Sequence, residues 1–237
     1  MAGDESEEMP EREDLRRLAA LAAAVAAGDD AEVTSLGMRL AGRVPRRSAE
    51  EAVLQTYLFA GFPAAINGFM ALELGWARGG DAGHGQPPAE RDGDAWQGRQ
   101  EPASSAACCL DDWRARGEEL CRRVYGPDYE RLRRRMHALN PALDERMIVE
   151  GYGRTLSRPG IPASARELCA VAALAARGAE RQLAAHLAGA RRLGVDESLL
   201  REVARESVER YAPERMQARL LALLAPGPAA GGDGPPA

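Results

Sequence analysis

SARELCAVAALAARGAERQLAAHLAGARRLG, residues 164–194, contains two runs rich in Ala and Leu, and Gly178 separates them. Ala and Leu are strong helix formers, and glycine is common just after a helix end. The first run predicts a helix over residues 164–176, and the second predicts a helix over 180–193 that ends at Gly194. This stretch therefore predicts a helical hairpin.

Two ionisable residues, Glu167 and His186, lie on opposite arms of this hairpin. Glu167 comes 11 residues before Gly178 and His186 comes 8 residues after it, so a rise of about 1.5 Å per residue places them at heights that differ by about 5 Å. Each shares its helix face with apolar residues, so we expect both side chains to project into a common interior. Such a pair perturbs the pKa of each partner and is a typical proton donor or acceptor at neutral pH. The same spacing also fits a buried ion pair that binds no substrate.

The rest of the chain has the composition of an all-α protein. Apolar residues make up 45% of the 237 residues and aromatic residues 5%, with many Ala and few β-branched residues. We therefore expect neither an all-β nor a Rossmann fold. The sequence has no lysine, so all 31 basic residues are arginine, which excludes Schiff-base chemistry and a P-loop lysine.

The charge pattern argues against nucleic-acid and membrane partners. The formal charge is −5, whereas phosphate backbones are bound by basic surfaces. Arginines cluster at residues 131–135, but Asp128 and Glu130 lie beside them, so we interpret this segment as a solvated helix face of mixed charge. No stretch approaches the ~18 apolar residues of a membrane span, and the N-terminus is acidic. We expect a cytoplasmic protein.

Neither the cysteines nor the histidines form a local metal or redox motif. The four cysteines have no C-x-x-C spacing, and the three histidines lie far apart and outside any H-x-x-x-H or H-E-x-x-H pattern. We therefore expect reduced thiols, no metal and no cofactor.

Segments rich in Gly, Pro and polar residues divide the chain into two blocks. We expect disorder at residues 1–10, 79–106 and 225–237. These segments leave an N-terminal helical block at 11–78 and a C-terminal block at 107–224.

Glycines, prolines and capping residues predict the helices of each block. In the first block the predicted helices are 14–27, 32–40, 49–60 and 64–76. In the second block they are 111–125, 129–139, 143–156, the hairpin, 197–211 and 214–224. Ser48 and Ser164, each followed by Glu three residues later, are expected to cap the helices that follow them, and Asp196 is expected to cap the helix at 197.

The two blocks repeat at a constant offset of 150 residues. The matched positions include Leu18 with Leu168, Gly28 with Gly178, Val53 with Val203, and Pro63 with Pro213. Gly and Pro mark helix ends, so their repetition indicates an internal duplication.

The hairpin and its flanks resemble a known family. The similar segments are Arg158-Pro159-Gly160, Ala165-Arg166-Glu167-Leu168, and an H-x-x-x-A-x-x-x-G helix at His186, Ala190 and Gly194. They resemble the carboxymuconolactone decarboxylase family, which includes the AhpD-like alkylhydroperoxidases. Arg116-Gly117-Glu118 and Val124-Tyr125-Gly126 are similar to the opening of the decarboxylases, and Glu51 to Ala65 is similar to the closing helix and G-x-P turn of the same domain. The resemblance implies an AhpD-like helical bundle that assembles as a homo-oligomer.

The resemblance also implies a chemistry. γ-Carboxymuconolactone decarboxylation needs no cofactor, because the lactone carbonyl delocalises the electron pair that CO₂ leaves behind. It needs arginine to hold carboxylates and an acid to protonate carbon. Arg158, Arg166 and Arg181 are the candidate clamps, and His186 paired with Glu167 is the candidate acid.

The sequence departs from both branches of the family. In the peroxidase branch the His helix carries C-x-x-C-x-x-x-H, but Ala179 and Gln182 stand at the two cysteine positions here, so disulfide-based peroxide reduction cannot run there. In the decarboxylase branch a second histidine commonly lies in the closing helix, where this chain has Gln55 in the first block and Arg205 in the second.

Each block retains features that the other lacks. The first block has Leu36 where the second has His186, but it keeps the glycine-containing turn at Gly61 and Pro63. This complementarity suggests a composite site, with Glu167 and His186 from the second block and with Gly61, Pro63 and Gln55 or Tyr57 from the first. The alternative is that one copy has degenerated and only completes the bundle.

These observations predict a carboxymuconolactone-decarboxylase-like protein that acts without metal or cofactor on a small carboxylate or lactone. Catalysis requires that Glu167 and His186 face a poorly hydrated pocket that is large enough for a substrate. Two other interpretations stay open. One is a family member with residual redox activity, marked by a reactive Cys169, and the other is a non-catalytic oligomeric binding protein.

Overall fold

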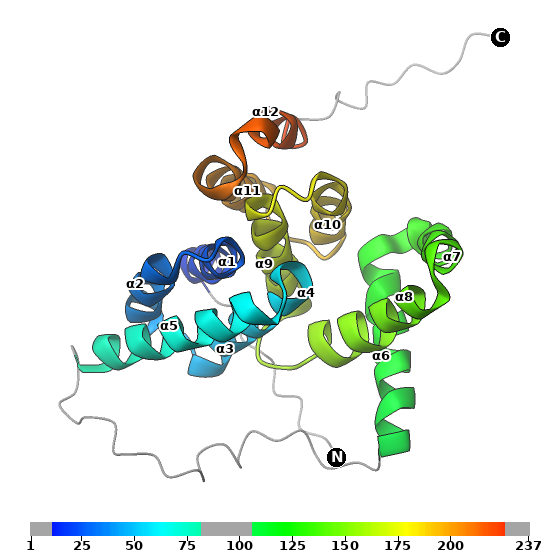
Figure 1. Ribbon diagram of the computed structural model, residues 1–237, viewed down its shortest axis with the longest axis horizontal. Helices are drawn as coiled ribbons and strands as arrows, with labels where there is room; N and C mark the ends of the chain where they lie inside the picture. The colour runs from blue at the N-terminus through cyan, green and yellow to red at the C-terminus, as the bar shows by residue number, and fades with distance from the viewer. Residues whose placement is uncertain (1–10, 82–105, 226–237) are drawn as a thin grey trace.

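The computed structural model describes residues 11–81 and 106–225. All regular elements in these two ranges are helices (Figure 1), so the predicted all-α class is confirmed. The expected disordered segments lie almost entirely outside the described residues. No helix within the described ranges combines the length and the hydropathy that crossing a bilayer requires.

The N-terminal half contains five helices in the described residues. They are α1 (Arg12–Ala27), α2 (Asp30–Leu40), α3 (Arg46–Leu54), α4 (Tyr57–Ala60) and α5 (Phe62–Asp81). The C-terminal half begins with α6 (Ala106–Tyr125), η2 (Gly126–Asp128), α7 (Tyr129–Leu139), α8 (Pro141–Arg146) and the π-helix η3 (Met147–Leu156). It continues with α9 (Ala163–Ala176), α10 (Glu180–Arg192), α11 (Glu197–Tyr211) and α12 (Glu214–Ala222).

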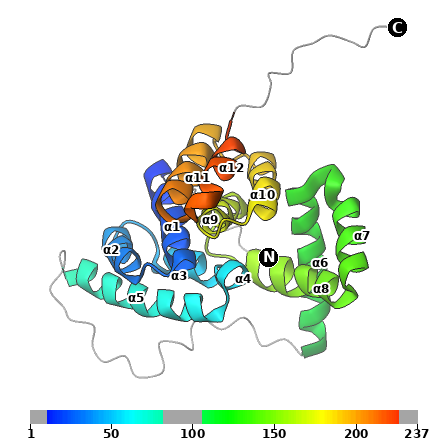
Figure 2. The same ribbon diagram turned by 45° about the horizontal axis from the view of Figure 1, so that its top comes forward.

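Helix α9 occupies the centre of the molecule. Figures 1 and 2 show it between α1 to α5 on one side and α6 to η3 on the other, with α10 to α12 nearby. All residues of α9 from Ala165 to Ala176 are buried, and α1, α10 and α11 pack against it. A helix that is apolar on nearly all faces is stable only inside a core. Its many alanines let α1, which is also rich in Ala, approach closely along its length.

The helices repeat at the offset that the sequence predicted. α1, α2 and α3 begin at Arg12, Asp30 and Arg46, and α9, α10 and α11 begin at Ala163, Glu180 and Glu197, which are 151, 150 and 151 residues later. The turns that follow α1 and α9 each contain a glycine with positive φ, 76° at Gly28 and 69° at Gly178. This repetition supports the predicted duplication.

Two of the three predicted helix caps are wrong. Helix α3 begins at Arg46, so Ser48 lies inside it, and the Ser48 hydroxyl donates instead to the Gly160 carbonyl at 2.9 Å. Helix α9 begins one residue before Ser164, with Pro162 at the cap position. Asp196 does cap α11, because its carboxylate accepts a hydrogen bond from the Leu199 amide at 2.9 Å.

Several predicted boundaries also change. The predicted helix 49–60 is split, because α3 ends at Leu54 and α4 is a short separate turn. Helix α5 runs to Asp81, beyond the predicted end of the first block at 78. The predicted helix 143–156 consists of α8 and the π-helix η3.

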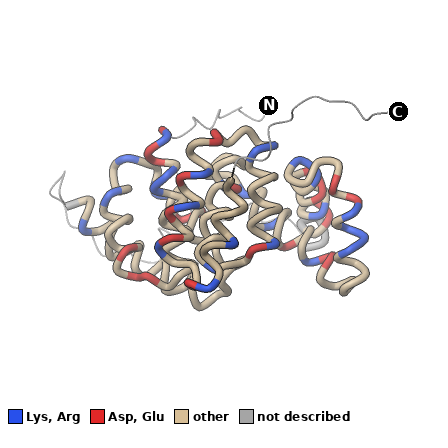
Figure 3. The backbone as a smooth tube through the Cα atoms, turned by 90° about the horizontal axis from the view of Figure 1, so that it is seen from above, with Lys and Arg blue, Asp and Glu red and all other residues tan. Residues whose placement is uncertain are grey.

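The arginine cluster on α7 has the mixed character that the sequence predicted. Arg131 pairs with Asp128 at 2.9 Å, and Arg133 pairs with Asp144 at 2.7 Å. Figure 3 shows basic and acidic positions interleaved along the helices rather than one basic face. This distribution gives no support to a nucleic-acid interface.

Candidate functional site

Glu167 and His186 meet across the α9–α10 hairpin. Glu167 lies on the first half of α9 and His186 on α10, and the turn at Gly178 brings the two helices side by side. His186 Nδ1 lies 2.8 Å from Glu167 Oε2. The side chains are only 9% and 3% exposed. The contact predicted from helix spacing is therefore present, in a buried position.

The imidazole has one nitrogen held by the protein and one without a partner. Nδ1 binds Glu167, whereas Nε2 forms no hydrogen bond within the described residues. No fully buried polar side-chain atom among these residues lacks a partner, so Nε2 keeps some contact with solvent. Glu167 thus orients His186 through Nδ1, and Nε2 is not engaged by any other described residue.

Opposing effects determine the charge of this imidazole. Burial lowers the pKa of His186, but the charge of Glu167 and the hydrogen bond to it act in the opposite direction and prevail. The pKa of His186 is therefore raised above its ordinary value. The pair favours the protonated imidazole, which is the form that can donate a proton.

Helix α6 packs closely against the pair. Gly189 on α10 faces Val124 on α6, and a Cβ at position 189 would lie 2.6 Å from Val124 Cγ1 and 3.0 Å from Glu167 Oε2. Only glycine leaves room for this approach. The contact surrounds the Glu167 carboxylate with apolar groups.

Three aromatic residues near the pair were not predicted as site residues. Phe59 on α4 meets the His186 ring edge to face, with centroids 6.0 Å apart. Tyr125 and Tyr152 meet each other at 6.3 Å, and burial raises the pKa of Tyr125 to about 12 and that of Tyr152 well above its usual value. Both tyrosines are therefore neutral hydroxyl groups at physiological pH. Val124-Tyr125-Gly126 was part of the family resemblance and could have signalled Tyr125, whereas no sequence signal marked Phe59.

The thiols of Cys121 and Cys169 are buried in the core. Burial raises the pKa of Cys169 to about 12, and it raises the pKa of Cys121 to the same range. A thiol with such a pKa is almost entirely protonated at neutral pH. No group of His, Cys, Asp and Glu in the described residues has the arrangement needed to hold a metal ion.

Arg166 and Gln55, predicted to contact substrate, lie between the two halves of the protein. Arg166 is 2% exposed and donates to Glu51 Oε2 at 2.9 Å and to the Arg158 carbonyl at 2.7 Å. Gln55 is fully buried and donates to the Arg166 carbonyl at 3.0 Å. Arg158 Nε also donates to Glu51, at 3.1 Å. The structure thus uses Arg166 and Gln55 for internal contacts and gives neither a free face toward a ligand.

The other predicted binding residues form no hydrogen bond or ion pair with Glu167 or His186 in the described structure. Tyr57 binds Thr155 through its hydroxyl at 2.6 Å and stacks on Phe62. Gly61, Pro63 and Arg181 are exposed. The first half does reach the pair, as the composite hypothesis required, but it does so through Phe59.

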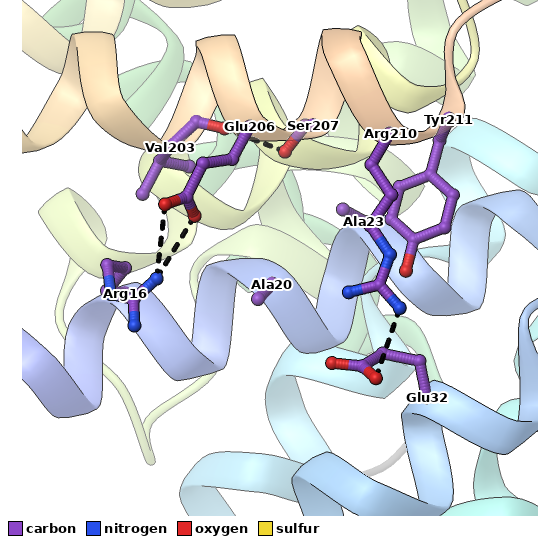
Figure 4. A pocket seen from close by; sticks show the side chains of 9 residues that line it. All are labelled: Arg16, Ala20, Ala23, Glu32, Val203, Glu206, Ser207, Arg210 and Tyr211. Atoms are coloured by element: carbon purple, nitrogen blue, oxygen red, sulfur yellow. Dashed lines mark hydrogen bonds and ion pairs between the residues drawn. The ribbon is translucent and has the colours of Figure 1, made fainter.

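The three best-formed pockets of the described residues lie away from the pair, because neither Glu167 nor His186 lines any of them. The smallest, about 50 Å³, lies between α1 and α11, where Arg16 pairs with Glu206 and Arg210 pairs with Glu32 (Figure 4). Beside the pair, Phe59 packs on the His186 ring and Val124 lies against Gly189.

The fold and the pair define an all-α protein with a buried carboxylate–imidazole pair in a helical hairpin. Residues 145–224 match the family model of the carboxymuconolactone decarboxylase family, so the suspected family is confirmed for this segment. The segment contains η3 and α9 to α12, and therefore both Glu167 and His186. It does not include the first half, so the duplication stays a prediction. No curated protein matches the chain.

Proposed function

We propose that this protein performs cofactor-free acid–base chemistry on a small carboxylate or lactone, with His186 as the group that exchanges the proton. The observation that carries the proposal is the asymmetry of the imidazole. Glu167 holds Nδ1 at 2.8 Å while Nε2 has no partner in the described residues. This arrangement is typical of a histidine whose second nitrogen acts on a substrate.

The proposed reaction divides the work between the two residues. Glu167 orients the ring and stabilises the imidazolium, so it is a positioning residue. In a decarboxylation, the electron pair of the broken C–CO₂ bond would move onto the conjugated lactone carbonyl. Nε2 of His186 would then deliver its proton to carbon. The family match to residues 145–224 supports this class of reaction.

A substrate needs access to Nε2, and Phe59 is the side chain that controls it. The Phe59 ring packs edge to face on the imidazole and is only partly buried. Because it belongs to the short helix α4 of the first half, a small displacement of this helix would open the pair to a ligand. The proposal therefore assigns Phe59 the role of a cover.

The test is the turnover of 4-carboxymuconolactone by the protein, which is measured as the release of CO₂. His186→Gln is expected to lower kcat by about 10²–10⁴-fold, the usual contribution of general acid–base catalysis. Glu167→Gln should lower kcat less, because the proton donor remains. His137→Gln is the matched control, because His137 is 65% exposed and lies on α7. Retention of full activity by His186→Gln would contradict the proposal.

A non-catalytic binding or scaffold protein is the second candidate. The observation that favours it is that the three best-formed pockets of the described residues do not include Glu167 or His186. It predicts no turnover by the wild type and an effect of His186→Gln on stability alone. Residual thiol redox activity is less well supported, because Cys169 is buried and its pKa is raised to about 12.

Cytoplasmic localisation and homo-oligomerisation stay predictions from the sequence and the family resemblance. Sedimentation velocity on the full chain measures the oligomeric state directly.

A further inference from the structure

Of the three pockets described above, one carries a clear excess of positive charge. It lies between α6 and the segment that joins η3 to α9, and we call it the α6–η3 cleft. The cleft has a volume of about 380 Å³, a size within the range of about 300–1,000 Å³ that is usual for small-molecule sites. Its charged residues are Arg116, Arg123 and Arg158 against one carboxylate, Glu119. The cleft is therefore positively charged in a protein whose overall charge is −5.

The arginines of this cleft differ from those of the other pockets. Arg116 and Arg123 are exposed on α6, seven residues apart, and neither forms an ion pair or hydrogen bond in the described structure. Arg158, by contrast, is anchored to Glu51 at 3.1 Å. Two exposed arginines and one arginine anchored by a carboxylate thus line the cleft. Two turns of a helix separate Arg116 from Arg123, so both project from the same face of α6.

The second pocket of about 380 Å³ gives a useful contrast. It contains Arg12, but this guanidinium pairs with Asp196 at 2.6 Å and with Glu202 at 2.8 Å. In the small pocket between α1 and α11, Arg16 and Arg210 are also paired with carboxylates. Only the α6–η3 cleft, among these three, combines room for a ligand with arginines that have no carboxylate partner.

The floor of the cleft is apolar. It contains Leu120, Leu156 and Ile161, which are 8%, 5% and 2% exposed. The first residue of α9, Ala163, also lines it, so the positive end of a helix of 14 residues adds to the potential. An apolar floor below a positive rim fits a ligand with a carboxylate at one end and a hydrocarbon body at the other.

We propose that the α6–η3 cleft is a binding site for a small aromatic or alicyclic carboxylate, with Arg116 and Arg123 as its recognition residues. The site is separate from the acid–imidazole pair, because neither Glu167 nor His186 lines the cleft. The inference therefore does not depend on whether the pair is catalytic. It assigns the chain a carboxylate-recognition function of its own.

The test is calorimetric titration of the full-length protein with benzoate. Arg116→Gln/Arg123→Gln is expected to weaken benzoate binding about tenfold or more, because the charge-assisted hydrogen bonds to the carboxylate are lost. Arg131→Gln is the matched control, since Arg131 is an exposed arginine on α7, 76% exposed, outside the cleft. It should bind benzoate as the wild type does. His186→Gln should also bind normally, which separates this test from the test of catalysis.

Two further probes test separately the carboxylate and the apolar body of the proposed ligand. Benzamide has the same ring without the charge and should bind at least tenfold more weakly than benzoate. Inorganic phosphate has charge without an apolar body and should compete poorly. The proposal is overturned if the wild type shows no saturable binding of benzoate, or if Arg116→Gln/Arg123→Gln binds benzoate as tightly as the wild type does. It is also overturned if Arg131→Gln loses as much affinity as the double variant, or if benzamide or phosphate binds as tightly as benzoate.

Discussion

Burial and a neighbouring carboxylate have opposite effects on the pKa of His186. A buried imidazole without a partner would be neutral at physiological pH, because transfer of a charge from water into a core is unfavourable. Glu167 reverses this preference through a hydrogen bond of 2.8 Å. The residue that supplies the reversal lies 19 positions away in sequence, and only the hairpin brings it into contact.

This competition predicts that stability depends on pH. The pKa of His186 is higher in the folded protein than its ordinary value of 6.5, so the folded state binds the proton more tightly than the unfolded state does. The stabilisation is complete below the unfolded pKa and is lost as pH rises through the folded pKa. We expect the free energy of unfolding of the wild type, relative to His186→Gln, to fall as pH rises above 6.5 and through the raised folded-state pKa.

Urea denaturation at a series of pH values measures this difference. His137→Gln is again the control for loss of an imidazole away from the pair, because His137 lies on α7 and its side chain is 65% exposed. A constant difference between wild type and His186→Gln across this range would contradict the assigned coupling to Glu167.

At the scale of helices, α6 and η3 contact each other through glycine. A Cβ at Gly117 would lie 2.1 Å from the Ile148 carbonyl oxygen, and a Cβ at Gly153 would lie 1.9 Å from that of Trp113. Both distances are far shorter than a van der Waals contact, and both involve backbone atoms that no rotamer change can move. The two backbones therefore approach more closely than any larger residue permits. The cleft and the tyrosines both depend on this helix pair.

Gly153→Ala is therefore expected to destabilise the protein by about 1–3 kcal/mol, the usual cost of overpacking. Gly151→Ala is a matched control in the same π-helix, because the nearest atom to its Cβ would be the Arg146 carbonyl oxygen at 3.9 Å. This control should be neutral or slightly stabilising, since alanine favours helical structure more than glycine does. Guanidinium denaturation compares the two variants, and equal stabilities would disprove the close contact.

Local sequence signals predicted the helices well where glycine and proline mark their ends. The hairpin turn at Gly178 and the Asp196 cap were both evident in this way. Ser48 had the same local signal as a cap but lies inside α3, because its hydroxyl binds Gly160 more than 100 residues away. The π-helix was not predictable either, since its extra residue per turn accompanies the tertiary contact of α6 with Gly153.

In the candidate site, the contacts within one hairpin were predictable from the sequence, and the contacts between the two halves of the protein were not. Glu167 and His186 follow from helix spacing, which is a local property. Phe59 approaches His186 from the other half of the protein, and no spacing rule relates the two. Arg166 was predicted as a substrate clamp because it is an arginine near the family motif, but its partner Glu51 lies 115 residues earlier.

At the scale of the whole molecule, one buried ionic cluster joins the two halves. Glu51 on α3 accepts hydrogen bonds from Arg166 on α9 and from Arg158 in the preceding segment. Gln55 and Ser48 add hydrogen bonds to backbone carbonyls of the second half. Burial lowers the pKa of Arg166, while the charge of Glu51 and its hydrogen bond oppose that effect. Such a cluster stabilises one relative placement of the halves only if every member is present.

Removal of the Glu51 charge should therefore be costly. Glu51→Gln is expected to destabilise the protein by about 3–5 kcal/mol, because it leaves the Arg166 guanidinium buried without a counter-charge. Glu209→Gln is the control, since Glu209 is 53% exposed and its pair with Arg205 is long at 3.7 Å; this change should cost less than about 1 kcal/mol.

Adding Arg166→Met to Glu51→Gln should recover part of the loss, because the uncompensated charge is then gone. Denaturant titrations of the four proteins of this double-mutant cycle measure the coupling. Additive losses from Glu51→Gln and Arg166→Met would mean that the two residues act independently and that other contacts fix the relative position of the two halves.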